Sequence, residues 1–503
     1  MTTPRIIPVF TAAQIVRALQ TNWGGSDQGT LRSWTGPRVT YSVPTTAPFD
    51  VFGGSAETAG FTAPGKPGAL TLSGMAALAF ELWDDLIAIS LDPVTDAALA
   101  PRAAITVAFS ATTRGGGIYA QNHGTVRKAG LPPGSLALDA GRVWLNPAWP
   151  EFQQWAMGER GLEALLHEIG HTLGLSHPAP YDVSDAVMPT YAANAGFTRD
   201  TLRWTVMSYF PANADDPAVD RSGGGQYGDV TGDGINAATP LIYDILAIQR
   251  KYGADPATRT GDDTYGFHAR LSGPWRPVFS FDAGNLDPVI AIYDAGGHDT
   301  LDASGYATNQ RVSLVPGTLS DIGHLTQNVG IAFHTVIEDA VGGTGNDRIT
   351  GNAAANRLQG GAGSDVILGG GGGDVLEGGT GSDKLIGDAG DDRLAGGAGT
   401  DRLLGGAGRD TFVFDAPPGA RDTVLDFVGG TDHIALSAAA FPGVSAGMLT
   451  PGVLATHPGD HLLYDQAKGL LLYDADGSGA GAAIPIALLI GHPALSAADI
   501  LLI

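Results

Sequence analysis

Apolar residues in the first 260 positions recur with two different periods. From Ser73 they recur every three or four positions, which predicts a core helix of more than four turns. Its apolar residues are Met75, Leu78, Ala79, Leu82, Leu86 and Ile89. At 39–43 and 105–109 apolar and polar residues alternate instead, as in strands with one buried face. A helix between two strands predicts an α+β core.

Two shorter patterns accompany this core. Thr11–Gln14 reads as a capping box that opens a short helix. The apolar face of that helix holds Ile15, Val16 and Leu19. After a break at Gly115–Gly117, Ile118–Ala120 is a predicted edge strand. An exposed edge of this kind can pair with an extended peptide.

A second helical stripe carries a chemically informative motif. Its apolar positions are Leu162, Leu165, Leu166, Ile169 and Leu173. On this helix His171 lies one turn after His167 and about 40° around the axis, so both imidazoles can reach one metal ion. Glu168 lies about 60° from His171, close enough to hold a water on the metal without being a ligand. The helix is therefore predicted to carry a catalytic zinc site.

A third histidine, His177, needs a chain reversal to join the other two. It would point to the far side if the helix continued, and Gly174 permits a reversal because glycine enters the left-handed region without a Cβ clash. A histidine pair with one glutamate can arise by chance in a helix. Three histidines at one helix end are costly without a metal, so the full string favours zinc. Met207 is a candidate floor beneath it, although a lone methionine is more often only a core residue.

A nine-residue repeat runs through eight units in the second half of the chain. The units begin at Gly342, Gly351, Gly360, Gly369, Gly378, Gly387, Gly396 and Gly405. The sixth position is Asp347, Asp365, Asp374, Asp383, Asp392, Asp401 or Asp410, and Asn356 in the second unit. The eighth position is Ile349, Leu358, Ile367, Leu376, Leu385, Leu394, Leu403 or Phe412. This phasing predicts a parallel β-roll with calcium-binding turns rather than a flexible glycine-rich linker.

Composition narrows the range of partners. The net charge of −24 argues against binding to nucleic acids or anionic membranes and suits cation-rich sites. The chain has no cysteine, which excludes disulfides and thiolate-ligated zinc. No N-terminal secretory signal and no run of about 18 apolar residues is visible, so we expect no membrane span.

Together these motifs resemble the serralysin family of secreted bacterial metalloproteases, within the metzincin clan. The resemblance covers nearly the whole chain and extends to Ala247–Arg250, Arg259–Asp262 and Tyr293–Asp302. It implies an α+β metzincin-like protease domain followed by an all-β parallel β-roll domain. A predicted helix from Leu241 ends near Gly253, where we place the boundary. The expected regions are 1–36 (N-terminal arm with a candidate propeptide and first helix), 37–253 (protease) and 254–503 (calcium-binding roll).

The resemblance assigns roles around the zinc motif. His167, His171 and His177 bind one catalytic zinc ion, and Glu168 is the general base. Tyr209 is a further zinc ligand that swings to support the transition state. Met207 forms the structural Met-turn.

The resemblance also implies several structural calcium ions. Ligands at the domain junction are Arg259, Gly261, Asp263, Asp294, Gly296, Gly297 and Asp299. Those at the head of the roll are Glu338, Gly343, Gly345 and Asp347. Ligands in the later turns are Gly360, Gly361, Gly363, Asp365, Gly369, Gly370, Gly372, Asp374, Gly378, Gly379, Gly381, Asp383, Asp392, Asp401 and Asp410. Because Asn356 departs from the repeat, we expect weaker or absent calcium where its turn pairs with that of Asp374.

A further implication is secretion by a type I (ABC) apparatus. The family's C-terminal export signal, an acidic residue followed by hydrophobic ones, is matched by Asp499–Ile503. We expect an extracellular monomer with protein substrates and a periplasmic protein inhibitor as a candidate partner. Asp229–Gly234 and Asp474–Gly479 resemble parts of calcium loops without completing one.

The sequence therefore predicts a secreted zinc-dependent endopeptidase that attacks peptide bonds with zinc-activated water. Two alternatives come from other classes. One is a non-enzymatic, calcium-dependent surface or adhesion protein with a vestigial protease domain, against which the intact Glu168 argues. The other is a zinc hydrolase with a different activity, such as an amidase.

Overall fold

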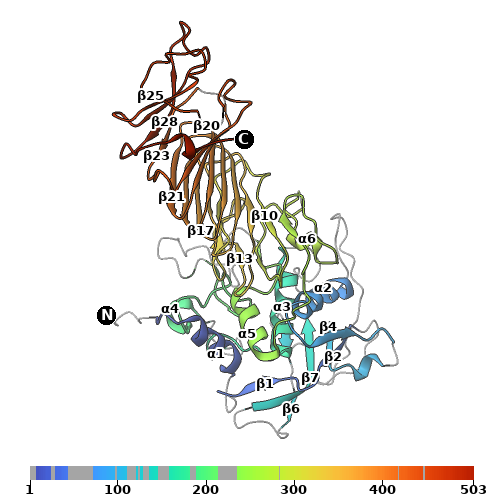
Figure 1. The fold of residues 1–503 in the computed structure, drawn as a ribbon. Helices are drawn as coiled ribbons and strands as arrows, with labels where there is room; N and C mark the ends of the chain where they lie inside the picture. The colour runs from blue at the N-terminus through green and yellow to red at the C-terminus, as the bar shows by residue number, and fades with distance from the viewer. Residues whose placement is uncertain are drawn as a thin grey trace. The chain divides into compact units, whose positions relative to one another are not determined.

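The computed structural model of the 503-residue chain is shown in Figure 1. It describes residues 7–23, 29–43, 72–96, 99–109, 120–122, 125–127, 135–145, 158–181, 189–212, 214, 235–282, 284–416, 419–445 and 448–503. The chain forms two compact units. Unit 1 comprises Met1–Thr260, Ser272–Ala295 and Leu325–Thr335, and unit 2 comprises Gly261–Leu271, Gly296–His324 and Val336–Ile503. Two segments that follow residue 260 therefore belong to the unit that carries the zinc motif.

Unit 1 is built on a mostly parallel sheet with the strand order β1-β7-β4-β2-β3. These strands are β1 (Leu31–Ser33), β7 (Ser135–Leu145), β4 (Ile105–Phe109), β2 (Arg38–Ser42) and β3 (Ser90–Pro93). Two short strands, β5 (Ala120–Asn122) and β6 (Thr125–Arg127), run antiparallel to β7. The strands predicted at 39–43 and 105–109 are confirmed as β2 and β4. The long strand β7 was not predicted, and Ile118 of the predicted edge strand lies outside the described residues.

Among the described residues of unit 1, four helices are at least ten residues long. They are α1 (Ala12–Thr21), α2 (Leu72–Asp84), α3 (Arg160–Thr172) and α5 (Ile242–Tyr252). The predicted capping box is present at Thr11, and Ile15, Val16 and Leu19 are buried. All five apolar residues of the motif helix stripe are fully buried, so α3 is a packed and rigid support for the metal motif.

The prediction of a helix from Ser73 through Ile89 was too long. α2 ends at Asp84, and the chain turns into β3 at Ser90. The Asp84 carboxylate accepts a hydrogen bond from Leu91 N at 2.5 Å, which fixes this turn. Leu86 is buried in the turn instead of on a helix face, so apolar spacing alone extended the helix beyond its real end.

Smaller elements complete unit 1. The strands β9 (Ile290–Ile292) and β13 (Val329–Ile331) pair in parallel. Short helical turns are η2 (Ala100–Arg102), α4 (Tyr191–Asn194) and α6 (Arg276–Phe279). No helix in the described ranges is long and apolar enough to cross a membrane.

Unit 2 is a parallel β-roll in which successive nonapeptides alternate between two sheets (Figure 1). One sheet holds β8 (Thr264–Gly266), β10 (Thr300–Asp302), β14 (Asp339–Val341), β16 (Arg357–Ala362), β18 (Val375–Gly381), β20 (Arg393–Gly399), β22 (Thr411–Phe414), β24 (His433–Leu436) and β29 (Ile500–Leu502). The other holds β11 (Arg311–Ser313), β15 (Arg348–Thr350), β17 (Val366–Gly371), β19 (Lys384–Ala389), β21 (Arg402–Ala407), β23 (Asp422–Val424), β28 (Ile484–Leu489), β27 (Leu470–Tyr473), β26 (Leu462–Asp465) and β25 (Thr450–Pro451). The strand β12 (Leu319–Ser320) and the turn η5 (Ala497–Asp499) complete the unit.

The register of the roll follows the nine-residue period. Leu358 pairs with Leu376 in one sheet, and Ile367 pairs with Leu385 in the other, so the chain advances one layer every two repeats. All eight apolar residues at the eighth position are fully buried between the sheets. The predicted β-roll is therefore confirmed, and its core is a single stack of aliphatic and aromatic side chains.

Candidate metal centre

The three predicted zinc ligands lie together at the C-terminal end of α3. His167 and His171 belong to the helix, and His177 returns after Gly174, whose φ of +87° is left-handed as expected. The Nε2 atom of His177 lies 3.1 Å from Nε2 of His171 and 3.3 Å from Nε2 of His167. Three imidazole nitrogens thus face one small volume, which matches the three protein ligands of a catalytic zinc site.

Each imidazole is oriented through its other nitrogen by a backbone carbonyl. The Nδ1 atoms lie 2.7 Å from Val206 O for His167, 2.7 Å from Leu175 O for His171, and 3.0 Å from Tyr181 O for His177. A carbonyl only accepts, so each Nδ1 carries the hydrogen and each neutral Nε2 presents a lone pair. Three converging lone pairs repel one another unless a cation lies between them.

Protonation of the histidines does not supply that positive charge at neutral pH. Burial, aided by charge on His171, lowers the pKa of His167 to about 3. Burial, aided by the other two histidines, also lowers the pKa of His177 well below its ordinary value. Both imidazoles are therefore neutral at neutral pH, the form that binds zinc. The donor set fits a zinc ion held by His167, His171 and His177.

Met207 lies beneath the histidine cluster. Its side chain is fully buried, and a Cβ added to Gly170 would lie only 2.7 Å from Met207 Sδ. Gly170 thus lets the methionine pack directly against the backbone of α3. Trp83 on α2 also packs against Gly170, and its Nε1 donates to Leu166 O at 3.2 Å. Met207 and Trp83 therefore pack against the helix that carries two of the ligands.

Tyr209 lies beside the ligands. Its ring centroid is 4.4 Å from that of His177 and 5.7 Å from that of His167, and the side chain is only half-buried. Glu168 follows His167 on α3 and is 8% exposed. The candidate base and the candidate oxyanion donor therefore belong to the same small region as the three histidines.

One buried acid that orients this centre was missed by sequence reasoning. The Asp244 carboxylate accepts hydrogen bonds from Val206 N at 2.8 Å, from Leu241 N at 2.9 Å and from the Thr205 hydroxyl. Burial raises the pKa of Asp244 to about 7, against the opposing effect of these hydrogen bonds. Because Val206 O orients His167, Asp244 supports that ligand through the backbone. Its only sequence signal is an acidic residue in the first turn of a helix.

Tyr181 was missed as well. Besides accepting from His177, it stacks on that imidazole with ring centroids 5.4 Å apart. Its hydroxyl donates to Asp200 Oδ1 at 2.8 Å, and the Ser208 hydroxyl donates to the same oxygen at 2.8 Å. Tyr181 therefore ties the third histidine to the segment that carries Met207 and Tyr209.

The predicted calcium ligands of the nonapeptide turns form two columns in unit 2. One column is Asp347, Asp365, Asp383 and Asp401, and the other is Asn356, Asp374, Asp392 and Asp410. Within a column, the backbone N–H of each residue donates to Oδ1 of the residue 18 positions later, at 2.7–3.0 Å. One oxygen of each acceptor carboxylate is thereby fixed.

The other carboxylate oxygen marks candidate cation positions. In five turn aspartates the Oδ2 atom is buried and accepts no hydrogen bond from the described residues. These are Asp365, Asp374, Asp383, Asp392 and Asp401. A Cβ added to Gly360 would overlap Asp365 Oδ2 and lie 2.6 Å from Gly378 O, so carboxylate and carbonyl oxygens converge there. Burial raises the pKa of Asp365 to about 6. Buried carboxylate oxygens beside carbonyl oxygens are the ligand set that Ca²⁺ prefers.

Both columns continue past the last nonapeptide. Asp401 N donates to Asp422 Oδ1 at 2.9 Å, and Asp410 N donates to Asp432 Oδ1 at 3.1 Å. Burial, with the Asp401 charge nearby, raises the pKa of Asp422 to about 7. The spacings are 21 and 22 residues instead of 18, so these two acids fall outside the repeat and were not predicted.

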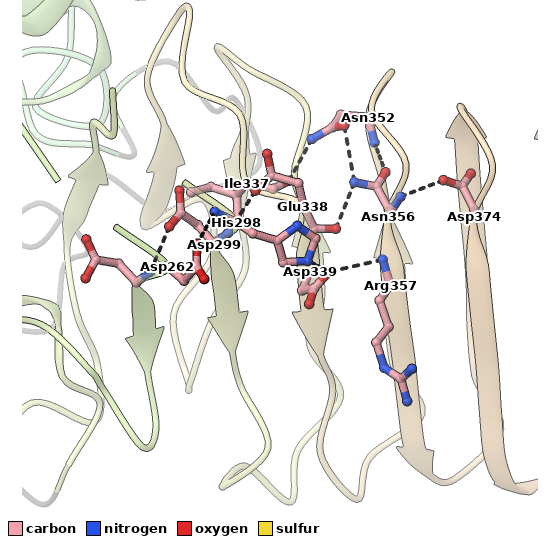
Figure 2. A network of polar contacts seen from close by, with 11 residues as sticks. Asp262, His298, Asp299, Ile337, Glu338, Asp339, Asn352, Asn356, Arg357 and Asp374 are labelled. Carbon is pink, nitrogen blue, oxygen red and sulfur yellow. Dashed lines mark hydrogen bonds and ion pairs between the residues drawn. The ribbon is translucent and has the colours of Figure 1, made fainter. Parts of the chain in front are cut away.

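The unusual turn at Asn356 is closed by amide hydrogen bonds (Figure 2). Asn356 Nδ2 donates to Glu338 O at 2.8 Å, and its Oδ1 accepts from Asn352 N at 2.8 Å. Asn352 Nδ2 donates in turn to Ile337 O at 2.8 Å. Asn356 N still donates to Asp374 Oδ1 at 2.8 Å, which keeps the column in register. Weaker calcium binding at this turn stays a prediction.

The first layers of unit 2 bring further predicted ligands together (Figure 2). Asp299 N donates to Glu338 Oε2 at 2.8 Å. Asp263 N donates to Asp299 Oδ1 at 2.8 Å. Carboxylate oxygens of Asp263 and Asp299 lie within 4.8 Å of each other. A Cβ at Gly297 would overlap Gly261 O, so these two predicted positions are also in close contact.

Two predicted junction ligands belong to unit 1. Arg259 has a positive φ of +44° and donates through Nε to Tyr293 O at 2.9 Å. Its guanidinium also pairs with the buried Asp85 carboxylate at 2.5 Å. Asp294 is 2% exposed, and its backbone N–H donates to the Thr335 hydroxyl at 3.2 Å. Arg259 is thus held in a strained backbone conformation by its own side chain.

Comparison with known proteins agrees with both halves of the chain. The model of the matrixin family matches residues 69–201, and that of the peptidase M10 serralysin C-terminal family matches residues 254–445. Metalloprotease AprA of Pseudomonas entomophila (strain L48) is 35% identical over 431 residues, which cover 84% of this chain and 78% of the relative. Metallopeptidase AprA of Pseudomonas marginalis is 38% identical over 374 residues, 72% of this chain and 69% of the relative.

Serralysin G of Dickeya chrysanthemi aligns over a shorter stretch. It is 42% identical over 213 residues, which span 42% of this chain and 41% of the relative's length. Each AprA alignment is longer than either compact unit, so it includes residues of both. The histidine cluster of unit 1 and the β-roll of unit 2 agree with the two matched family models. This chain belongs to the serralysin family of zinc metalloendopeptidases.

Proposed function

We propose that the chain hydrolyses internal peptide bonds of proteins, with His167, His171 and His177 holding zinc and Glu168 as the general base. Zinc bound there supplies a Lewis acid that polarises the scissile carbonyl and lowers the pKa of the attacking water. Glu168 takes a proton from that water as it attacks and returns it to the departing amine. The Tyr209 hydroxyl donates to the carbonyl oxygen as negative charge develops on it.

One observation carries this proposal. The Nε2 atom of His177 lies 3.1 Å from that of His171 and 3.3 Å from that of His167, while a backbone carbonyl fixes the hydrogen of each imidazole on Nδ1. This arrangement disfavours an empty cluster and fits a three-histidine zinc site with an open fourth position. Glu168 occupies the next position of α3 after His167, and we assign it as the base that acts at that open position.

A peptide substrate is proposed to bind in an extended conformation. β5 (Ala120–Asn122) pairs antiparallel with the C-terminal half of β7, and among the described strands only β7 pairs with it. Its free edge can accept a further strand by backbone hydrogen bonds, which give affinity without requiring one particular side chain. This mode suits an endopeptidase that cleaves unfolded proteins.

The role of Tyr209 is tested by Tyr209→Phe. We expect kcat to fall by about 10²-fold with little change in KM, because the hydrogen bond to the developing oxyanion is lost. Tyr191→Phe is the matched control, since that hydroxyl donates to Thr198 O at 2.7 Å. Steady-state kinetics on a fluorogenic peptide measure both variants. Equal kcat values for Tyr209→Phe and the parent would rule out the oxyanion role.

Calcium is proposed as the structural cofactor of the roll. The buried Oδ2 atoms of five turn aspartates and the carbonyl oxygens beside them support ions in the turns. Glu338, Asp299 and Asp263 form a second candidate group in the first layers of unit 2. At low cytosolic calcium the roll would stay unfolded and competent for export, and it would fold outside the cell.

Secretion by a type I (ABC) apparatus is proposed on the C-terminal pattern Asp499–Ile503. In unit 2, Asp499 accepts from Ser496 N at 2.7 Å, and Leu501, Leu502 and Ile503 are 39%, 37% and 50% exposed. We also propose that the domain boundary follows Gly253 and that the N-terminal arm contains a propeptide. The active form is proposed to be a monomer, and its proposed inhibitor is a periplasmic protein. The non-enzymatic alternative is not favoured, because the complete ligand set and Glu168 are retained.

A further inference from the structure

The segment that returns His177 to the zinc centre is short and sharply bent. We call residues 173–178, which follow α3, the return loop. Gly174 has a φ of +87°, and a Cβ there would overlap Arg32 O and lie 3.1 Å from Lys251 Nζ. The bend is therefore pressed against the backbone of β1 and the side chain of a lysine on α5.

This loop controls two of the three candidate ligands. His177 is part of it, and Leu175 O accepts the hydrogen bond from His171 Nδ1 at 2.7 Å. A shift of the loop would therefore move one imidazole directly and release the orientation of another. Groups that hold the loop in place act on the geometry of the metal centre even without touching the metal.

Lys251 holds the bend itself. Its Nζ donates to Gly174 O at 2.8 Å and to Arg32 O at 2.6 Å, so one ammonium joins the return loop to β1. Burial lowers the pKa of Lys251 to about 7. A buried lysine is costly to keep, because its polar group must be removed from water. Here the amine satisfies two backbone carbonyls, one of them at the C-terminal end of α3, where carbonyls lack helical partners.

Neighbouring donors hold the adjacent carbonyls. The Tyr252 hydroxyl donates to Leu173 O at 2.7 Å, and Trp34 Nε1 donates to Thr172 O at 2.9 Å. Three successive carbonyls at the end of α3 thus each accept from a side chain that is distant in the sequence. On the far side of the bend, Ser176 N donates to Leu19 O at 2.6 Å, and the Ser176 hydroxyl donates to Ala18 O at 2.9 Å. The return loop is fixed by α5 on one side and by α1 on the other.

We propose that Lys251 is a positioning residue for the zinc centre: by tying Gly174 O to Arg32 O, it holds the return loop so that His171 and His177 keep their metal-binding geometry. This inference rests on the proposed zinc-binding function. Lys251 lies on α5, outside the histidine motif, so the proposal gives this helix a role in zinc affinity.

The test is Lys251→Met, which keeps an unbranched side chain and removes the donors. Arg250→Met is the matched control, because Arg250 is the preceding residue of α5 and is exposed. The full-length protein is saturated with calcium, and the Kd for zinc is measured by competition with a chromogenic zinc chelator. We expect the zinc Kd of Lys251→Met to rise by about 10- to 100-fold, as for other residues that orient metal ligands, and that of Arg250→Met to stay within about twofold.

Two outcomes contradict the proposal. If Lys251→Met binds zinc as tightly as the parent, or only lowers the thermal unfolding temperature without changing the zinc Kd, the lysine is merely structural. If Lys251→Met does not fold, Tyr252→Phe removes the donor to Leu173 O in the same loop, together with the acceptor of Trp34 N, and should raise the zinc Kd by a smaller factor. An unchanged Kd there overturns the proposal. Failure of the parent itself to bind zinc would instead refute the proposed function.

Discussion

Replacement of Glu168 by glutamine is expected to lower kcat by about 10²- to 10⁴-fold while zinc stays bound. The amide has the size of the carboxylate but cannot take a proton from the attacking water, and general-base catalysis is usually worth this factor. The three histidines and the carbonyls behind them are unchanged, so the metal site should persist. Peptide turnover and zinc content measured on the same preparation separate the two effects.

Glu159→Gln provides the control for this experiment. Glu159 is the N-cap residue of α3, so the same chemical change is made at the other end of the helix. That variant should retain parental turnover. A near-normal kcat in Glu168→Gln, with zinc bound, would show that Glu168 is not the general base.

Removal of calcium is expected to unfold the roll. Burial disfavours the charged form of the turn aspartates and raises the pKa of Asp365, Asp374 and Asp383 to about 6. At pH 7.5 these carboxylates are ionised and stacked within one column or the other, and without cations they repel. A single ion present at about 100 times its Kd stabilises the folded state by about 2.7 kcal/mol, and several ions add to this. Hydrogen exchange of the full-length protein should show protected amides at residues 357–412 in calcium and rapid exchange in a chelator.

Adjacent aspartates supply a matched pair for the same experiment. Asp392 has a buried Oδ2 without a donor among the described residues, whereas Asp391 is exposed and accepts from Arg409 N at 2.9 Å. Asp392→Asn should bind less calcium and lose protection at a higher calcium concentration, and Asp391→Asn should match the parent. Full protection of the roll in chelator would show that calcium is not the condition for its folding.

Local patterns in the sequence predicted much of this fold. The eight apolar positions of the nonapeptides are all buried, because a strict period forces each of them to the same face of successive strands. The stripe of α3 and the left-handed conformation at Gly174 were predicted for similar reasons, since helix periodicity and glycine stereochemistry act within a few residues.

Contacts between distant segments could not be predicted in this way. Asp244 and Lys251 act through hydrogen bonds to residues 38 and 77 positions away, and no local pattern marks a buried acid or lysine as a partner of a remote backbone. Asp422 and Asp432 continue the aspartate columns, but an insertion shifts them out of the nine-residue period. The end of α2 was missed because Leu86 keeps helical spacing after the chain has turned at Asp84.

The central claim, that the histidine cluster is the zinc centre of an endopeptidase, is tested most directly by cleavage of unfolded casein. The full-length protein is assayed in excess calcium, with zinc removed by a zinc-selective chelator and then restored. The account predicts internal cleavage that disappears with zinc and returns when about one zinc ion per chain is added, as expected for one catalytic site. Intact casein with both metals present, or cleavage that persists without zinc, would contradict it.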